Sequence, residues 1–587
     1  MDNLTVASIL REISALLAVK GEDPFKVRSY EKAADSIEYL NRPLSEIVAE
    51  GSLLDIPGIG KNLAPKIEEM VRTGRSSFLE RLKREIPETV LELLMVPGIG
   101  PKTAHMLFRD LGVVSLSGLE EALARGSLRD LAGLGPKRVE LISKGVAEVK
   151  KYLGKALLGI ALPLGEELVS RLETEGFRCT IVGEVRRRTP VVSQLELLVC
   201  VNEGEWLACS DALGDRCLSR VEEVLGVGLE WQRNDGGLIR GRSSGPGLKV
   251  EVSLCSPAEF GLWTLILTGE EGYVSHVREV LAERGWSVAP GGLKRDGDTQ
   301  IFPVPDEATL FAAVGLCPVP PEIRHRPEMW REVEDRGFKL LSTSDIRGDL
   351  HVHTTWSDGV MSIADAVSEC RRLGYEYVAI TDHATKISFI QGLDAGRIPL
   401  QAEEIARASR LFPDVSLIRG VEVDVLKDGS LSLPDEDLGQ VELVIASIHQ
   451  GFEPPDVYLE RLKKAASNPF VHVIGHPTGR KMGRRPPAIV DIEPLLEICS
   501  RTGTCLEVNA SPDRLDLDEE AVRLAWQAGV KLVVATDAHS VRGLSDMRYG
   551  VDACLRRAGL PPDAVLNSRP LSEWFPLKRS SRRNSRS

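Results

Sequence analysis

The pattern of hydrophobic and polar positions changes along the chain. The first residues, Met1–Ile13, have the apolar spacing with which an amphipathic helix begins. From about residue 346 onward, short β-rich apolar runs alternate with helical stretches, which is the pattern of a parallel sheet or barrel. We count seven such runs, which begin at residues 350, 377, 416, 443, 471, 505 and 531. The sequence therefore predicts a chain that starts with helices and ends in a β/α sheet or barrel.

The length and composition are those of a modular globular protein. A chain of 587 residues is too long for one core, because cores stop growing at roughly 250–300 residues. Hydrophobic residues make up 43% of the chain, and no apolar run approaches the roughly 18 residues that would span a bilayer. The start has no signal-peptide pattern, and the ten cysteines include no CxxC pair. We therefore expect a cytoplasmic protein with several domains, reduced thiols and no membrane partner.

The charge of the chain is unevenly distributed. The net charge of −13 argues against a nucleic-acid binder that is held by overall charge. Residues 1–155 carry 23 Lys and Arg against 22 Asp and Glu, so this part is near neutral at +1 and leaves −14 for the remainder. The last residues, 576–587, form a basic tail with too few apolar side chains to pack, and we expect it to be disordered. Any contact with DNA must therefore be local.

A short glycine-containing repeat occurs three times near the N-terminus. Leu54–Lys61 recurs as Leu94–Pro101, and a weaker copy spans Leu131–Lys137. The segments resemble helix-hairpin-helix motifs, in which glycines permit a tight turn and the next helix offers free backbone N–H groups to a phosphate. Such contacts position a protein on DNA without reading its sequence, whereas the simpler alternative is an ordinary glycine-rich helix connection. The candidate DNA-contacting residues are Gly58, Gly60, Lys61, Gly98, Gly100, Lys102, Gly133 and Gly135.

The first 75 residues resemble the opening domain of bacterial-type family X DNA polymerases. The resemblance rests on the helical start and on the segment Lys20–Tyr30. In that family a lysine on the helix after the first hairpin can form a Schiff base with an abasic sugar, and Lys66 stands at the matching position. Such a lysine needs a lowered pKa to attack a carbonyl at neutral pH. The simpler alternative is a helical lysine that contacts a phosphate.

The resemblance continues through a polymerase-like palm and thumb at residues 156–316. The family pattern is G-S-x-R-R, then two aspartates one residue apart on a strand and a third on a neighbouring strand, which hold two magnesium ions. Here Glu184 replaces the serine, and the three aspartate positions hold Gln194, Glu196 and Glu251. Glutamine carries no charge, and the longer glutamate displaces its carboxylate in a site where magnesium demands strict geometry. We expect nucleotide transfer to be lost, although two glutamates with another metal could retain a trace.

Histidines and carboxylates follow the predicted strands of the C-terminal region. Barrel enzymes build their sites at the C-terminal ends of their strands. Seven of the ten histidines lie between residues 351 and 539, and six of them occupy such positions, whereas we assign His472 a structural role. Imidazole and carboxylate groups suit zinc, manganese or iron, and several cations would neutralise a phosphodiester and turn bound water into hydroxide. The candidate ligands are His351, His353, His383, Glu422, His449, His476, Asp537 and His539.

These residues lie in segments that resemble the successive motifs of a PHP (polymerase and histidinol phosphatase) domain. The segments are DLHVHTTWSDG (349–359), ITDHA (380–384), GVEV (420–423), ASIH (446–449), GHP (475–477) and ATDAHS (535–540). The resemblance implies a distorted seven-stranded barrel with nine metal ligands, and it adds Asp358 to the residues above. We expect up to three divalent ions, Mn²⁺ or Zn²⁺, in this domain.

The resemblance also implies how the ligands share the ions. His351, His353, Glu422 and Asp537 would hold one metal. Glu422 would bridge to a second metal, which is held by His449 and His476, and Asp358, His383 and His539 would take a third. The residues that we expect to carry the catalysis are His351, His353, Glu422, His449 and Asp537.

Together these patterns predict a multidomain protein. We expect all-α helix-hairpin-helix domains at 1–80 and 81–155, and an α/β nucleotidyltransferase-like palm and thumb at 156–316. A linker at 317–345 would lead to a distorted (β/α)7 PHP barrel at 346–575.

This organisation predicts a metal-dependent phosphoesterase in DNA repair. The main hypothesis is a 3′→5′ exonuclease, with removal of 3′-phosphates or cleavage at abasic sites as variants. One alternative is a working family X polymerase with a PHP editing domain. The others are a small-molecule phosphatase of the histidinol-phosphate type, which would have no use for the hairpins, and a DNA-binding scaffold without catalysis.

Overall fold

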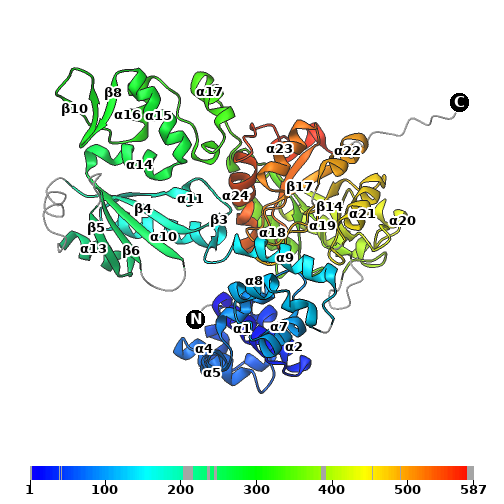
Figure 1. The fold of residues 1–587 in the computed structure, drawn as a ribbon. Coiled ribbons are helices and arrows are strands. Elements are labelled where there is room, and N and C mark those ends of the chain that lie inside the picture. Colours follow the sequence, from blue (N-terminus) through cyan, green and yellow to red (C-terminus); the bar gives the residue numbers. More distant parts are fainter. Residues whose placement is uncertain are drawn as a thin grey trace. The chain divides into compact units, whose positions relative to one another are not determined.

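The computed structural model describes residues 3–577 except 39, 41, 132, 203–215, 234–237, 244–247, 385–391, 453 and 490. Its contacts divide the chain, drawn in Figure 1, into two compact units. The first comprises Met1–Leu153, Gly359–Ser362 and Arg480–Pro487, and the second comprises Gly154–Asp358, Ile363–Gly479 and Ala488–Ser587. The predicted basic tail lies outside the described residues from position 578 onward. None of the described helices is long and apolar enough to cross a membrane.

The first unit is built from helices around one apolar core. They are α1 (Asn3–Lys20), α2 (Pro24–Glu38), α3 (Leu44–Glu50), α4 (Ala64–Thr73), α5 (Ser77–Glu85), α6 (Leu91–Leu94), α7 (Pro101–Leu111), α8 (Leu116–Ala124) and α9 (Pro136–Lys150). In α1, Val6, Leu10, Ile13 and Leu17 are buried, and their spacing of three or four residues places them on one face. This helix packs against α2 and α7, so the core joins both helix-hairpin-helix regions.

The three hairpin turns share one backbone conformation. Gly58, Gly98 and Gly133 have φ values of 86°, 85° and 84°, which lie in the left-handed region that side chains disfavour. The apolar residue after each glycine is buried, and its N–H donates to the carbonyl three residues earlier at 2.9–3.2 Å. The helices α4, α7 and α9 follow these turns. The third copy, whose sequence is the weakest, therefore forms the same turn as the other two.

A five-stranded sheet in the order β2-β4-β7-β6-β5 forms the palm-like part of the second unit (Figure 1). The elements here are β1 (Ala156–Leu157), α10 (Leu158–Thr174), β2 (Arg178–Val182), α11 (Gly183–Arg186), β3 (Val191–Val192), β4 (Gln194–Cys200), α13 (Arg216–Leu225), β5 (Leu229–Arg233), β6 (Ile239–Ser243) and β7 (Lys249–Cys255). Leu195 and Leu197 are buried at alternate positions of β4, so Gln194 and Glu196 face the other side of the sheet. The parallel register of β4 and β7 pairs Glu196 with Glu251.

The thumb-like part packs around a second apolar cluster. Its elements are α14 (Phe260–Thr268), α15 (Glu271–Glu283), β8 (Trp286–Ala289), β9 (Gly292–Arg295), β10 (Ile301–Phe302), α16 (Glu307–Val314) and α17 (Pro327–Arg336). Val319, Ile323, Val333 and Leu340 belong to the same cluster as the buried residues of α14, α15 and α16. The segment 317–345, which the sequence predicts as a linker, therefore contributes side chains to the core of the thumb.

The C-terminal part of the second unit is a parallel barrel-like sheet (Figure 1). Its strands are β11 (Gly348–Val352), β12 (Tyr377–Ile380), β14 (Ser416–Asp424), β15 (Leu443–Ser447), β16 (Val473–Ile474), β17 (Cys505–Asn509) and β18 (Leu532–Ala535), in that spatial order, with the short β13 (His383–Ala384) beside β14. Its helices are α18 (Ile363–Arg372), α19 (Arg397–Leu411), α20 (Asp435–Leu438), α21 (Pro455–Ser467), α22 (Glu493–Thr502), α23 (Glu519–Gln527), α24 (Met547–Gly550) and α25 (Leu571–Trp574).

The first and last strands of this sheet meet each other. A parallel bridge joins Val352 to Ala538, and the His353 N–H donates to the Ala538 carbonyl at 2.9 Å. The interior is filled by apolar side chains from successive strands, among them Leu350, Ile445 and Val473. The predicted fold class, helix-hairpin-helix domains followed by a polymerase-like region and a seven-stranded barrel, is confirmed.

The contact between α9 and the second hairpin depends on a glycine. A Cβ at Gly145 would lie 2.6 Å from Pro97 Cδ, whereas a Cβ at Gly118 in α8 would find its nearest neighbour, Ser115 Oγ, at 3.6 Å. Alanine favours a helix over glycine by about 1 kcal/mol. We therefore predict that Gly118→Ala raises the stability of the first unit by up to about 1 kcal/mol. Gly145→Ala should lower it by about 1–3 kcal/mol, because the hairpin must shift.

Urea unfolding followed by far-UV circular dichroism measures both substitutions in the full chain. Tryptophan fluorescence serves as the internal control, because all eight tryptophans lie at position 206 or beyond and report on the second unit. A Gly145→Ala protein as stable as the Gly118→Ala protein would contradict the close packing of α9 on the hairpin.

Candidate metal centre

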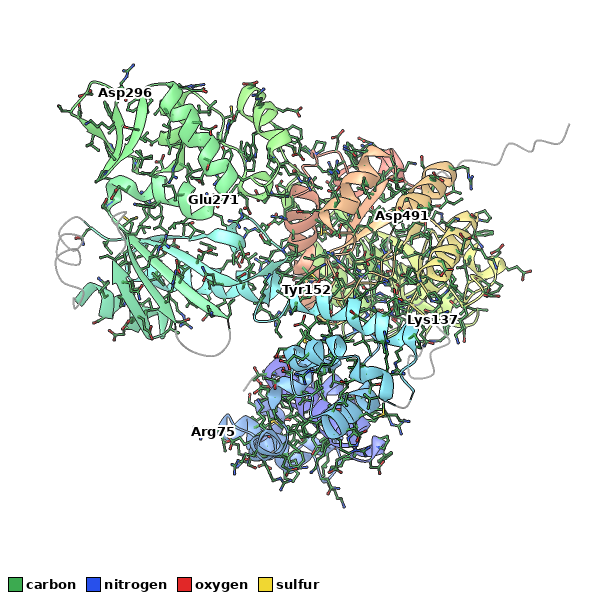
Figure 2. All side chains as sticks on the ribbon, in the orientation of Figure 1. Arg75, Lys137, Tyr152, Glu271, Asp296 and Asp491 are labelled. Atoms are coloured by element: carbon green, nitrogen blue, oxygen red, sulfur yellow. The ribbon has the colours of Figure 1, made fainter. Side chains whose placement is uncertain are left out.

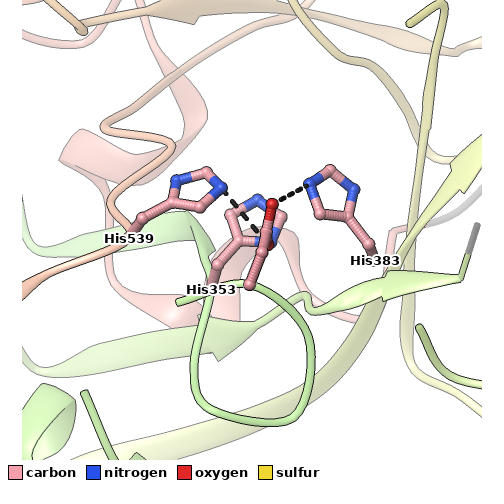
Figure 3. Close-up of side chains that lie close together, drawn as sticks. His353, His383 and His539 are labelled. Carbon is pink, nitrogen blue, oxygen red and sulfur yellow. Dashed lines mark ion pairs between the residues drawn. The ribbon is translucent and has the colours of Figure 1, made fainter. Parts of the chain in front are cut away.

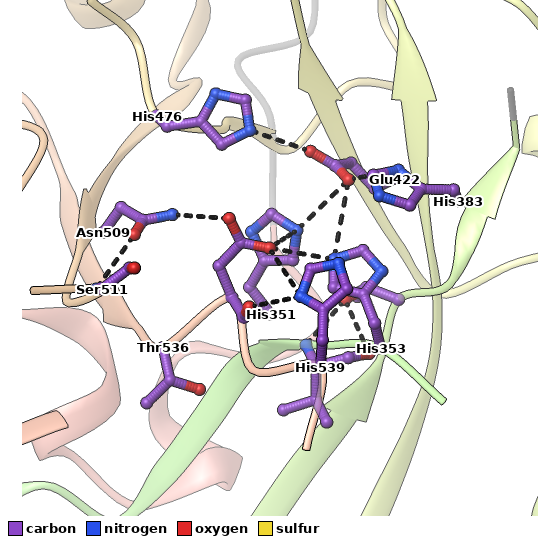
Figure 4. Close-up of polar contacts among 12 residues, drawn as sticks. His351, His353, His383, Glu422, His476, Asn509, Ser511, Thr536 and His539 are labelled. Atoms are coloured by element: carbon purple, nitrogen blue, oxygen red, sulfur yellow. Dashed lines mark hydrogen bonds and ion pairs between the residues drawn. The ribbon is translucent and has the colours of Figure 1, made fainter. Parts of the chain in front are cut away.

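Six histidines and three carboxylates converge at the C-terminal edge of the barrel strands (Figure 4). At the centre is Glu422, near the end of β14, whose side chain is fully buried. Its Oε1 lies 3.2 Å from His476 Nε2 and 3.4 Å from His449 Nε2. Its Oε2 lies 2.7 Å from His383 Nδ1 and 3.5 Å from His351 Nε2. The two oxygens of one carboxylate therefore face two different groups of imidazoles.

Asp537, which follows β18, completes the side of the centre formed by the first strand. Its Oδ1 lies 3.1 Å from His353 Nε2 and 3.6 Å from His351 Nε2. The same His353 nitrogen is 3.6 Å from Glu422 Oε2. The alternation of His351 and His353 along the chain thus brings both imidazoles to one side, as their spacing predicts.

Asp358 organises a further group of ligands in the loop after β11. Its Oδ1 lies 3.4 Å from His539 Nε2, and its Oδ2 lies 3.6 Å from His383 Nε2. The ring of His353 stacks between those of His383 and His539, with 4.3 Å between centroids on each side (Figure 3). Residues from the segment after β11, from β13 and from the loop after β18 therefore meet at this point.

Donor atoms that lie within 4.8 Å of one another form three sets among the described residues. The sets are His353, Asp358, His383 and His539, then His351, His353 and Glu422, and finally His383, Glu422 and His449. Compared with the predicted grouping, His353 also belongs to the Asp358 set and His383 also belongs to the Glu422 and His449 set. His476 belongs to none of the three sets, although its Nε2 lies 3.2 Å from Glu422 Oε1.

The spacing of these donors fits metal ions. Two ligands that share a metal at about 2.1 Å lie roughly 3.0–3.4 Å apart, and most of the nitrogen–oxygen distances above fall at 3.1–3.6 Å. Several buried donor atoms have no hydrogen-bond partner among the described residues, and they include both oxygens of Glu422 and Nε2 of His351 and His353. Native proteins rarely leave such atoms unsatisfied. The donor set and its geometry are therefore consistent with metal binding.

The carboxylates and the histidines of the centre shift one another's protonation. Burial raises the pKa of Glu422, but the charges of the surrounding histidines, His383 first, outweigh it and hold this pKa well below its usual range. Asp537 behaves in the same way through His351. Burial lowers the pKa of His353 to about 3 and that of His476 to about 4. The neighbouring carboxylates outweigh burial and raise the pKa of His351, His449 and His539, that of His449 to about 10. Since neutral imidazoles and anionic carboxylates ligate metals, an ion that binds here must displace protons from these three rings.

A second layer of carboxylates orients the histidines, and the sequence prediction missed it. Glu507 Oε1 lies 2.6 Å from His351 Nδ1, and its Oε2 accepts the His476 N–H at 2.5 Å. Asp424 Oδ1 lies 2.7 Å from His449 Nδ1. The contacts to the rings of His351 and His449 direct the other ring nitrogen of each toward Glu422, whereas the contact to His476 holds its backbone N–H. The alternation of side chains along a strand could have indicated both residues. Asp424 stands two residues after Glu422 on β14 and so faces the same side, and Glu507 lies at the middle of β17.

The backbone at the centre is held in strained conformations. Asp537 and His476 have φ values of 56° and 27°, in the left-handed region that non-glycine residues seldom adopt. The loop that carries Asp358 is fixed by the buried Asp382, which accepts hydrogen bonds from the Thr354 N–H and from Ser357 Oγ at 2.7 Å each. Such strain persists only where the surrounding structure determines the position of each ligand.

The palm positions lie together, but their carboxylates have protein partners. Glu251 is buried and accepts from Arg242 Nε at 2.6 Å, with Arg240 Nη1 at 3.7 Å. Burial and then the charge of Glu251 raise the pKa of Glu196, which favours its neutral form. The Oε2 of Glu184 accepts the Ser193 N–H at 2.5 Å. Two carboxylates of the palm therefore engage an arginine or the backbone, in contrast to Glu422 of the barrel.

The predicted DNA-contacting residues lie at the surface of the first unit. Lys61, Lys102 and the neighbouring Lys137, which is labelled in Figure 2, are exposed near the starts of α4, α7 and α9. A Cβ at Gly60, Gly100 or Gly135 would meet no atom within 4 Å among the described residues. The backbone before each helix is therefore open to an approaching group, as the hairpin hypothesis requires.

Lys66 differs from these exposed lysines. It lies on α4 and donates to the Tyr30 hydroxyl at 2.6 Å, and its Nζ lies 4.3 Å from the centre of the Phe78 ring. Burial, and then the positive charges of Lys26 and Arg81, lower its pKa.

Comparisons with known proteins agree with this architecture. Models of a helix-hairpin-helix domain match residues 1–76, a SAM-like helix-hairpin-helix tandem 90–147, a DNA polymerase beta thumb 264–325, and a PHP domain 349–511. The DNA polymerase/3′-5′ exonuclease PolX of Bacillus subtilis is 34% identical over 98% of both chains. A protein described as a probable phosphatase, from Thermoanaerobacter sp. (strain X514), is 31% identical over 38% of this chain and 89% of its own. DNA polymerase lambda of Rattus norvegicus is 22% identical over 54% of this chain and 55% of its own.

Hairpin domains, a polymerase thumb and a PHP barrel with a multinuclear donor set define the class: a PHP-containing protein of the DNA polymerase type. The chain belongs to the family X DNA polymerases, because its similarity to the Bacillus subtilis protein extends over almost its whole length. Helix-hairpin-helix domains within this family imply DNA binding.

The central role of Glu422 yields a prediction about metal content. Glu422→Gln keeps the shape of the side chain but removes the charge that both groups of imidazoles face, so the protein should lose at least one bound ion per chain. Metal is measured by inductively coupled plasma mass spectrometry after gel filtration. Glu442→Gln is the matched control, because Glu442 lies at the surface and pairs with Arg419 at 3.1 Å. Full metal content in the Glu422→Gln protein would contradict the bridging role.

Proposed function

We propose that this chain is a metal-dependent phosphoesterase that acts on DNA in repair, in the first place as a 3′→5′ exonuclease through its PHP barrel. The observation that carries the proposal is the contrast between the two candidate sites. The nine candidate ligand residues of the barrel lie in one cluster, whereas the palm lacks one of its three anions at Gln194. The Bacillus subtilis relative is named for both a polymerase and a 3′-5′ exonuclease.

Each residue of the barrel has a role in this proposal. His351, His353, Glu422 and Asp537 would hold one ion, Glu422, His449 and His476 a second, and Asp358, His383 and His539 a third. Such ions supply positive charge to a phosphodiester and a hydroxide nucleophile when they are bound. Glu507 and Asp424 fix the rings of His351 and His449, so that the donor nitrogens keep their direction. The hairpin turns would hold the DNA by its phosphates, independently of sequence.

Loss of nucleotide transfer in the palm is the second part of the proposal. Magnesium requires oxygen donors in near-ideal octahedral geometry, and here Glu251 instead pairs with Arg242. The arginines of the G-S-x-R-R region are also engaged. Arg186 donates to Thr268 Oγ1 at 2.7 Å and pairs with Glu307, while Arg187 pairs with Glu270 at 3.0 Å. These cations are therefore committed to the thumb rather than to a triphosphate.

The exonuclease proposal predicts shortening of DNA that depends on the barrel. Full-length protein with Mn²⁺ should shorten single-stranded DNA from its 3′ end, and His351→Ala should reduce the rate at least 100-fold, because a buried ligand is lost. His472→Asn is the matched control. His472 accepts the Val444 N–H through Nδ1 at 3.0 Å, and the asparagine oxygen can accept the same bond. The products of 5′-labelled and 3′-phosphorylated DNA distinguish exonuclease from 3′-phosphatase activity.

The same proteins decide between the alternatives. Cleavage of histidinol phosphate without shortening of DNA would favour a small-molecule phosphatase, and no hydrolysis of either would favour a scaffold. Template-dependent extension of a primer in gapped DNA by the His351→Ala protein would overturn the loss of polymerase activity.

Lys66 supports a second candidate activity, cleavage at abasic sites through a Schiff base. Burial lowers the pKa of Lys66, and its ammonium donates to the Tyr30 hydroxyl. We predict that borohydride traps wild-type protein covalently on DNA with an abasic site, and that Lys66→Ala lowers the trapped fraction at least tenfold. Lys61→Ala, which removes an exposed cation of the same hairpin, should leave trapping unchanged at saturating DNA. Equal trapping by the wild-type and Lys66→Ala proteins would leave Lys66 as a phosphate contact.

A further inference from the structure

A guanidinium group stands beside the carboxylates of the metal centre. Arg514 lies in the segment after β17, and its side chain is 13% exposed. Its Nε is 3.7 Å from Asp537 Oδ2, the oxygen that points away from His351 and His353. Burial lowers the pKa of this group, but the negative charges around it, Asp537 first and Glu422 among them, outweigh burial and raise it. Arg514 is therefore a permanent positive charge within reach of the centre.

The turn that carries Arg514 is anchored at both ends. The Asn509 N–H donates to the Asp516 carbonyl at 2.6 Å, and the reverse bond is 3.2 Å long. Between them, the Arg514 N–H donates to the Ser511 carbonyl at 2.9 Å, and the Ser511 N–H donates to Asn509 Oδ1 at 3.1 Å. Asp516 also accepts the Thr478 N–H, two residues after the ligand His476. The backbone at Arg514 is thus held by the same strand ends that position the candidate ligands.

The contact between Arg514 and Asp537 is longer than that of an arginine which forms a close ion pair with a carboxylate. Bidentate arginine–carboxylate pairs have nitrogen–oxygen distances of about 2.7–2.9 Å, whereas this one is 3.7 Å. Asp537 Oδ2 already accepts a hydrogen bond from Asn509 Nδ2 at 3.1 Å. Asn509 therefore holds this oxygen of Asp537 by a hydrogen bond.

The charges around Arg514 point to an anionic ligand. The guanidinium is surrounded by the carboxylates of Asp537, Asp513, Asp516 and Glu422, and ions bound at the centre would offset the charges of Asp537 and Glu422. The planar fork of arginine matches the oxygens of a phosphate, to which it can donate two parallel hydrogen bonds. A phosphoryl group that contacted the ions on one side could accept from Arg514 on the other.

We propose that Arg514 is a phosphate-binding residue of the barrel, which holds the non-bridging oxygens of the substrate phosphate against the metal centre. This inference rests on the proposed function, because it names the residue that orients the phosphate which that function cleaves. It extends the site beyond its candidate metal ligands to a largely buried side chain from the segment after β17, a strand that supplies none of the nine candidate ligands.

The test compares Mn²⁺-loaded wild-type, Arg514→Ala, Arg514→Lys and Arg523→Ala proteins at full length. Arg523→Ala is the control, because Arg523 lies on α23 and pairs with the exposed Glu520. Three quantities are measured: metal per chain, the shift of the thermal unfolding midpoint caused by inorganic phosphate, and KM and kcat for a 3′-labelled oligonucleotide. We expect Arg514→Ala to keep its metal, to lose at least three quarters of the phosphate-induced shift, and to raise KM at least tenfold. Arg514→Lys should retain part of the shift, since it keeps the charge but not the fork.

The outcomes separate this inference from the function on which it rests. An Arg514→Ala protein with the wild-type phosphate-induced shift and the wild-type KM would overturn the inference. A loss of metal in proportion to the loss of phosphate binding would also overturn it, because Arg514 would then act by positioning Asp537. Arg514→Lys gives the same comparison if the alanine protein does not fold. If wild-type protein leaves DNA intact but binds phosphate through Arg514, the exonuclease proposal fails while the phosphate-binding role of Arg514 stands.

Discussion

The buried carboxylate of Glu422 is the group on which the architecture of the barrel depends. An isolated carboxylate in such a position would cost several kcal/mol, because burial removes the water that stabilises its charge. Here imidazole nitrogens approach both of its oxygens, and a second layer of acids, Glu507 and Asp424, fixes the rings from behind. The left-handed backbone at Asp537 and His476 belongs to the same arrangement. Packing of the strands supplies the free energy that keeps these unfavourable elements in place.

The palm and the barrel satisfy buried acids in opposite ways. In the barrel, both oxygens of Glu422 are left without hydrogen-bond partners among the described residues. In the palm, Glu251 is neutralised by Arg242, and Glu196 has a raised pKa. An ion pair within the protein removes both the negative charge and the space that a cation would need. The two sites therefore illustrate that the presence of acidic residues alone does not make a metal centre, since the neighbouring cations decide what the acids can bind.

Much of this organisation could be predicted from the sequence because its signals are local. The glycines of the hairpins specify the turns, the alternating histidines at the end of β11 specify a strand face, and the seven apolar runs correspond to the barrel strands. The second-layer residues Glu507 and Asp424 were missed, because their function depends on which ring nitrogen they face across the sheet. The packing of Val333 and Leu340 into the thumb was missed for the same reason. Contacts between segments that are far apart in the chain are difficult to predict from the local pattern of a single sequence.

The closure of the barrel between Val352 and Ala538 has a consequence for how the domain matures. His351 and His353 flank the first of these residues, and Asp537 and His539 flank the second, so one cluster draws its ligands from both ends of a segment of almost 190 residues. A ribosome must finish the last strand before the donors of the first can meet their partners. Ions bound between the first and the last strand would stabilise the closure of the barrel. Metal binding and the final step of barrel folding would then be coupled.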